Sequence, residues 1–153
     1  PMTRSTPAAD AAARSDTPGF VARLLDNPVT LLVARVCITL PFLAGGLAKL
    51  IDWQGGVAEM QQTGLEPAWA FNLAVLLVEL GGSALIILDR KTWLGAGALG
   101  VFTLLATLMA HRFWEFTGPA RSMEMNSFLE HATICAAFIF VVVVGLRPRV
   151  RGR

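Results

Sequence analysis

Residues 28–51 read PVTLLVARVCITLPFLAGGLAKLI. This stretch is charged only at Arg35 and Lys49, and it is long enough to span a membrane, because about 20 apolar residues cross roughly 30 Å of hydrocarbon. Further apolar stretches follow at 68–88, 93–110 and 127–146. The sequence therefore predicts an all-α, polytopic membrane protein whose four transmembrane helices form a bundle.

The composition agrees with this fold class. Hydrophobic residues make up 54% of the 153 residues, charged residues only 16%, and the mean hydropathy is +0.57. An average soluble domain is much more polar. We therefore expect a single compact membrane domain with the lipid bilayer as its main environment.

The basic residues indicate how the chain is oriented in the membrane. An even number of spans places the leading segment, the 89–92 turn and the tail on one side, whereas the opposite loops carry more Asp and Glu than Lys and Arg. Cytoplasmic loops are enriched in Lys and Arg. We therefore predict a bacterial cytoplasmic (inner) membrane protein with both termini in the cytoplasm. The basic residues on that side are Arg4, Arg14, Arg23, Arg90, Lys91, Arg147, Arg149, Arg151 and Arg153.

The segments outside the spans differ in character. Residues 1–18 lack hydrophobic periodicity and are predicted to be a disordered leader, and residues 19–27 are predicted to form a short interfacial helix before an N-cap at Asn27. The 52–67 loop is apolar enough to hold a short surface helix. Residues 147–153 are a basic cytoplasmic tail, which we interpret as a topology determinant, so no nucleic-acid partner is expected.

The two cysteines give no sign of a redox centre that belongs to this chain alone. Cys37 and Cys135 both fall within predicted spans, and the chain has no CxxC, no CxxCH and no zinc-ligand spacing. We therefore expect no metal site, and a redox role would require a cofactor or partner that carries the electrons.

Ionisable residues inside the spans are the first candidate functional groups, because charges at membrane depth are costly unless they are paired or hydrated. Arg35 and Glu79 fall at similar predicted depths, which predicts an ion pair. This pair has either a structural role, orienting the helices, or a functional one, binding a polar headgroup or relaying protons. The sequence supports the two interpretations equally.

A second group lies near the outer ends of the spans. Lys49 ends the first span, His111 ends the third, and Glu130 and His131 open the fourth. Such groups can bind a quinone carbonyl, pass protons or ligate a metal, and bis-histidine haem between His111 and His131 is not excluded.

Each of these groups also has a structural alternative. Lys49 can extend to the interface, and Glu130 can cap its own helix in the S-x-x-E pattern with Ser127. His131 is the weaker histidine candidate. His111 is the stronger one, because Thr107 continues its helix face.

Three motifs resemble the DoxX family of small bacterial membrane proteins: RVCITLPFLAGGLAKL from Arg35, VELGGSALIIL from Val78, and ATLMAHRFW ending at Trp114. The resemblance covers about 28–146. In the fourth span His131 takes the place of a family Asn, and Ala136 and Ala137 stand near the position of a glycine pair.

The resemblance implies a four-helix membrane protein linked to the quinone pool, as in a subunit of thiosulfate:quinone oxidoreductase. The family's polar positions match Arg35, Lys49, Glu79 and His111, whereas Glu130 and His131 do not match clearly. We expect Glu79 and His111 to carry the chemistry.

From the residues and the resemblance together we expect an oxidoreductase subunit that binds quinone and takes electrons from a protein partner. We expect a ligand site built from Arg35, Lys49, Thr107 and Trp114. The alternative is a non-catalytic scaffold or assembly subunit that recruits redox or stress-response proteins. The expected partner is a redox protein or, in a homo-oligomer, a second copy of this chain.

Overall fold

The computed structural model of the chain describes residues 18–145. These residues belong to two compact units, one up to Ala34 and one from Arg35 onward. The predicted leader before Pro18 and the predicted tail at 147–153 lie outside the described residues.

The first unit contains α2 (Gly19–Leu25) and the first turns of α3 (Pro28–Ile51). The side chain of Asn27 accepts a hydrogen bond from the Val29 N–H at 2.9 Å, which stabilises the start of α3. The helix and the cap predicted here are confirmed, and the location of α2 at a membrane surface stays a prediction.

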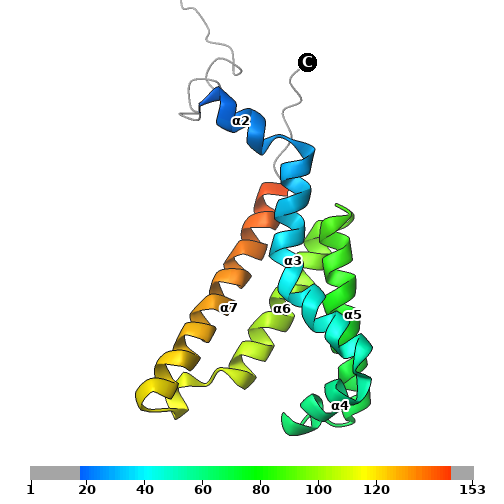
Figure 1. Ribbon diagram of the computed structural model, residues 1–153, viewed down its shortest axis with the longest axis vertical. Helices are drawn as coiled ribbons and strands as arrows, with labels where there is room; N and C mark the ends of the chain where they lie inside the picture. The colour runs from blue at the N-terminus through cyan, green and yellow to red at the C-terminus, as the bar shows by residue number, and fades with distance from the viewer. Residues whose placement is uncertain (1–17, 146–153) are drawn as a thin grey trace, which may run out of the picture. The chain divides into compact units, whose positions relative to one another are not determined.

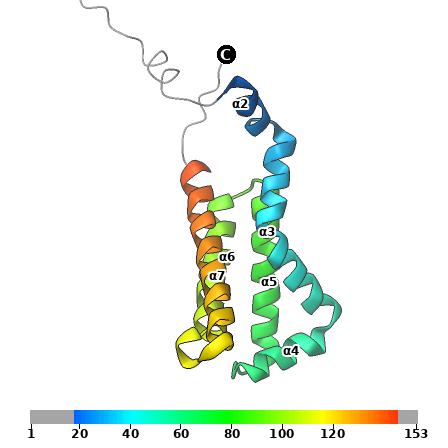
Figure 2. The same ribbon diagram turned by 60° about the vertical axis from the view of Figure 1, so that its left-hand side comes forward.

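The second unit contains the rest of α3 and all later elements. These are α4 (Trp53–Gln62), α5 (Ala68–Ile87), α6 (Thr92–Ala110), the short 3-10 helix η1 (Phe113–Glu115) and α7 (Gly118–Gly145). Helix α6 packs against both α5 and α7, and α4 packs against α5 (Figures 1 and 2). Among the described residues, four helices are long and apolar enough to span a membrane, so the polytopic α-helical fold class is confirmed.

The last helix begins earlier than predicted. The fourth span is predicted to begin at residue 127, but α7 starts at Gly118, so Ser127 and Glu130 lie inside the helix and do not cap its start. With 28 residues α7 is about 42 Å long at 1.5 Å per residue, which exceeds the roughly 30 Å of hydrocarbon. Hydropathy had located the apolar part of the helix and missed its polar first turns.

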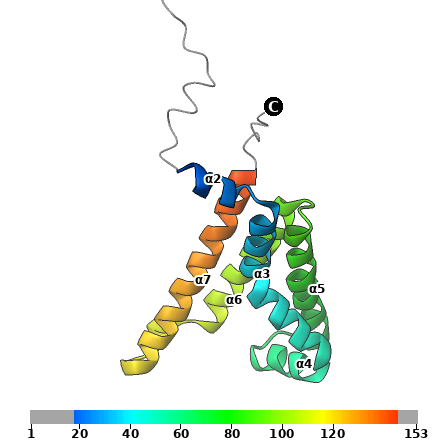
Figure 3. The ribbon, with the colours of Figure 1, turned by 45° about the horizontal axis from the view of Figure 1, so that its top comes forward.

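The centre of the second unit is an aromatic and aliphatic core. Phe42 of α3 contacts Phe138 of α7 and Phe102 of α6, with ring centroids 5.6 and 6.4 Å apart. Leu99 and Ile86 are fully buried beside them. Phe42 thus holds the second half of α3 against α6 and α7, whose ribbons run side by side in Figure 3.

Helix α3 contains Pro41, which lacks the N–H that would continue the helical hydrogen bonding. Figure 2 shows that the helix bends in its middle. Prolines inside helices commonly cause such a bend. The part after Pro41 carries Gly45, Gly46 and Lys49 and packs against α5.

Candidate functional site

Two buried polar side chains on one face of α5 form the centre of the candidate site. Asn72 is fully buried and Glu79 is 6% exposed. Both polar atoms of the Asn72 amide and Oε2 of Glu79 are buried without a hydrogen-bond partner. A buried polar atom left unpaired costs about 1–3 kcal/mol, so such atoms are rare in folded proteins. This face of α5 therefore has unused hydrogen-bonding capacity for a ligand or for water.

Lys49 brings a positive charge to this face. Its Nζ lies 3.2 Å from Oε2 of Glu59 on α4 and 4.0 Å from Oε2 of Glu79. Lys49 is largely buried and Glu59 is largely exposed. The ammonium therefore lies between an exposed carboxylate on α4 and a buried one on α5.

Glycines let the neighbouring helices approach these side chains. A Cβ on Gly45 would lie 2.9 Å from Oε1 of Glu79, and a Cβ on Gly56 of α4 would collide with the Asn72 amide. Both glycines lie in Gly-Gly pairs, where the missing side chains permit close helix contact. We call Lys49, Asn72 and Glu79, with these two glycines, the α5 polar seam.

The predicted ion pair between Arg35 and Glu79 is wrong. An Nη of Arg35 lies 2.8 Å from Oδ2 of Asp89, in the turn between α5 and α6, while Glu79 faces Lys49. The difference follows from side-chain direction. Helical Cα–Cβ bonds tilt toward the N-terminus of their own helix, and α3 and α5 run antiparallel, so the side chains of Arg35 and Glu79 diverge while those of Lys49 and Glu79 converge.

The two histidines form a separate cluster between α6 and α7. The rings of His111 and His131 are in edge-to-face contact, with centroids 4.8 Å apart. Nδ1 of His111 lies 2.8 Å from Oε2 of Glu124, and Nδ1 of His131 lies 2.8 Å from Oγ1 of Thr107. His131 is therefore held by contacts with both α6 and His111.

This arrangement does not suit a haem held between the two histidines. Axial histidines lie on opposite faces of a haem, whereas these two rings touch each other directly. No group of three or more His, Cys, Asp or Glu residues with the geometry of a metal site occurs among residues 18–145.

The other predicted site residues occupy different positions. Trp114 in η1 is half exposed and packs edge-on against Phe113 and Phe128. Glu130 is exposed on α7. Thr107 is buried and contacts His131. Neither Trp114 nor Glu130 joins the α5 polar seam.

Sequence reasoning missed the acidic partners. Asp89, Glu59 and Glu124 were assigned to turns or loops and were not considered as contacts of the span residues. The contact of Glu124 depends on the start of α7 before Ser127, which hydropathy does not report because the first turns of that helix are polar. The contacts of Asp89 and Glu59 depend on side-chain direction, which hydropathy does not report.

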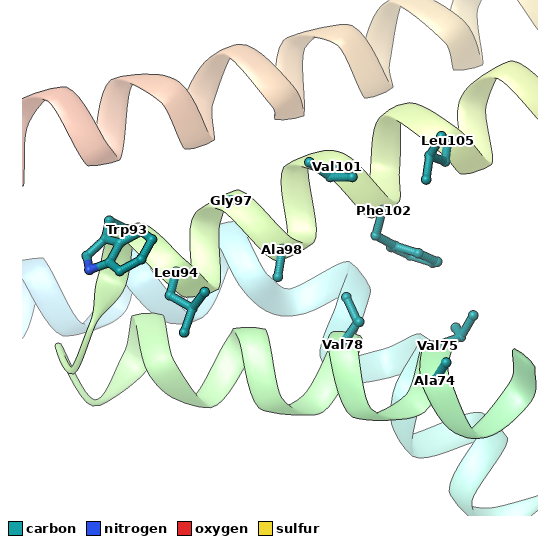
Figure 4. A pocket seen from close by; sticks show the side chains of 10 residues that line it. All are labelled: Ala74, Val75, Val78, Trp93, Leu94, Gly97, Ala98, Val101, Phe102 and Leu105. Carbon is teal, nitrogen blue, oxygen red and sulfur yellow. The ribbon is translucent and has the colours of Figure 1, made fainter. Parts of the chain in front are cut away.

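An apolar groove of about 510 Å³ runs between α5 and α6 (Figure 4). Its lining includes Val75 and Val78 of α5 and Phe102 of α6. Val75 lies one helical turn from Glu79, and no residue of the α5 polar seam lines the groove. Trp93 and Leu94 line its other end.

Comparison with known proteins gives two relatives and a family. The chain is 28% identical over 119 residues to the inner membrane protein YphA of Escherichia coli (strain K12), which covers 78% of this chain and 85% of that protein. It is 27% identical over 117 residues to the inner membrane protein YqjF of the same organism, covering 76% and 85%. No solved structure matches the chain. The DoxX family model matches residues 30–112, more than half of the chain, so this protein belongs to the DoxX family.

Proposed function

We propose that this DoxX protein is an integral membrane subunit of a quinone-linked redox system, which binds a quinone within its helices and receives electrons from a partner protein. Its relatives are named as inner membrane proteins, and we assign this chain to the same bacterial membrane with both termini in the cytoplasm.

The observation that carries the proposal is the set of buried polar atoms without hydrogen-bond partners in the α5 polar seam. Quinone carbonyls accept hydrogen bonds and quinol hydroxyls donate them. Nδ2 of Asn72 and Nζ of Lys49 are donors, and Oδ1 of Asn72 and Oε2 of Glu79 are acceptors. The seam can therefore satisfy either redox form of the ligand, and the ligand in turn would satisfy buried atoms that lack partners.

The apolar groove supports the same proposal. Quinones of biological membranes carry long apolar tails, and the groove between α5 and α6 is apolar, with Val75 of its lining one helical turn from Glu79. Its volume falls within the range of small-molecule sites. We infer that a quinone with its head group in the seam would place its tail along Val75 and Val78.

The residues present determine which roles we assign to this chain and which to its partner. A bound quinone supplies two-electron, two-proton redox chemistry. The chain has only two cysteines and no haem-attachment motif, so we assign electron delivery to the partner. Glu79 and Lys49 can hold and transfer protons at the ligand oxygens, while Asn72 orients the ring.

Binding of a short-chain ubiquinone to the full-length protein in lipid nanodiscs tests the proposal, with quenching of the four tryptophans as the signal. We expect saturable binding that Asn72→Leu weakens at least tenfold, because a loss of about 1.4 kcal/mol from hydrogen bonding is a factor of ten. Glu79→Gln should weaken it as well. The matched control is Glu59→Gln, which removes an exposed carboxylate that also contacts Lys49 and should change the affinity less than threefold.

Thermal unfolding separates lost binding from lost structure. Asn72→Leu removes a buried amide without partners, so its melting temperature should equal or exceed that of the wild type. Absence of saturable binding by the wild type, or equal binding by Asn72→Leu, would contradict the proposal. It would favour the alternative of a non-catalytic scaffold, which requires that Glu79→Gln and His111→Ala leave partner assembly intact.

A further inference from the structure

His111 and His131 form a polar cluster that the proposed quinone site does not use. The cluster lies where α6 ends and α7 passes beside it. Among residues 18–145, no hydrogen bond or ion pair connects it to Lys49, Asn72 or Glu79. It therefore needs an explanation of its own.

Thr107 determines which nitrogen of His131 carries the proton. The Thr107 hydroxyl lies 2.5 Å from the carbonyl oxygen of Thr103 and must donate to it, since a carbonyl only accepts. A hydroxyl has a single proton, so Oγ1 of Thr107 accepts from Nδ1–H of His131 at 2.8 Å. The Nε2 of a neutral His131 is then left with a free lone pair.

Glu124 has the same effect on His111. An ionised carboxylate accepts only, so Oε2 of Glu124 accepts from Nδ1–H of His111 at 2.8 Å. The Nε2 of a neutral His111 also keeps its lone pair. Both rings thus use Nδ1 to hold their positions and present Nε2 as a proton acceptor.

The charges around His111 and His131 determine how many protons the two rings can take up beyond their neutral forms. Glu124 is the carboxylate in direct contact and compensates one imidazolium. A second imidazolium would place two like charges in rings whose centroids are 4.8 Å apart.

The other charges on α6, η1 and α7 do not add a second counter-charge in contact with the rings. Arg112 pairs with Glu115 at 3.0 Å, and Arg121 and Glu130 are exposed on α7. The contacts of the two rings therefore compensate one positive charge and not two.

We propose that His111 and His131 form a proton-binding site that holds one proton per chain, with Glu124 as the counter-charge and Thr107 as a positioning residue. The proton binds at Nε2 of either ring, and both rings are half-buried where α6 ends. The site takes up and releases a proton independently of the α5 polar seam.

The chain has only two histidines, so nuclear magnetic resonance of the full-length protein with ¹⁵N-labelled histidine reports on this site alone. A titration in lipid nanodiscs covers pH 5 to about 8, the range in which histidine charge changes. We expect uptake of one proton per chain at Nε2, while both Nδ1 atoms remain protonated. Uptake of two protons, or of none across this range, would overturn the proposal.

Variants test the two supporting residues. Thr107→Val should let His131 adopt the Nε2–H tautomer, whereas Thr107→Ser keeps the hydroxyl and should keep the Nδ1–H signal. Glu124→Gln should reduce proton uptake to less than half of the wild-type amount. Glu59→Gln, which removes a carboxylate that contacts Lys49 and not the histidines, should leave it unchanged. An unchanged tautomer in Thr107→Val or unchanged uptake in Glu124→Gln would contradict the assigned roles.

Discussion

Charged side chains in this protein pair with the groups toward which their helices direct them. Arg35 contacts Asp89 in a turn, Lys49 lies between two carboxylates, and His111 contacts Glu124. Depth along the helix is a poor guide to these pairs, because long side chains point toward the N-terminus of their own helix. Two residues at one depth on antiparallel helices can therefore face away from each other.

A double-mutant cycle distinguishes the pair seen here from the pair predicted by depth. Arg35→Gln combined with Asp89→Asn should show a coupling energy of about 0.5–1 kcal/mol, because the pair is partly exposed. Arg35→Gln combined with Glu79→Gln should be additive. Free energies of unfolding in a denaturing detergent titration provide the measurement, and coupling to Glu79 in place of Asp89 would disprove the assignment.

At the scale of the elements, glycine contacts set the distance between helices. A Cβ on Gly95 of α6 would lie 2.6 Å from the backbone oxygen of Gly82 on α5. A Cβ on Gly97 would have no neighbouring atom within 4 Å. Both residues lie on the same helix with helical backbone geometry. They differ only in what they face, so they form a matched pair.

Gly95→Ala should destabilise the protein by about 1–3 kcal/mol, because backbone atoms cannot move aside as a flexible side chain can. Gly97→Ala should be neutral or stabilising by up to about 1 kcal/mol, because alanine has the higher helix propensity. The melting temperatures of the two variants and the wild type in detergent test both expectations. Equal destabilisation by both would show that the contact between α5 and α6 is not as close as described.

At the scale of the whole molecule, the arrangement of charge predicts its orientation in the membrane. The turn between α5 and α6 carries Arg90 and Lys91, and the opposite end of α5 follows the acidic α4 segment. The positive-inside rule therefore assigns the α5–α6 turn to the cytoplasm and α4 to the outer side.

Single cysteines test this orientation in a background with Cys37 and Cys135 replaced by alanine. A membrane-impermeant thiol reagent applied to intact cells should label Gln62→Cys at the end of α4. It should label Lys91→Cys only after the cells are permeabilised. The reverse pattern would invert the topology, and equal labelling of both would indicate a mixed orientation.

Much of the fold could be predicted because hydropathy is a local property of the chain. The first predicted span coincides with α3, and the second and third predicted spans differ from α5 and α6 by single residues at their ends. The start of α7 was missed because its first turns are polar, and hydropathy cannot separate a polar helix from a loop. The residue types in the candidate site were recognisable for the same reason, since charges inside apolar stretches are conspicuous.

The sequence by itself determined that the chain is a helical membrane protein with ionisable groups buried in it. Only the tertiary structure decided which groups meet, because that depends on helix direction, rotation and close contacts at glycines. It paired Glu79 with Lys49 in place of Arg35, left Asn72 without a partner, and brought Glu124 to His111. Each of these outcomes joins residues on different elements, and no local pattern along the chain encodes such a contact.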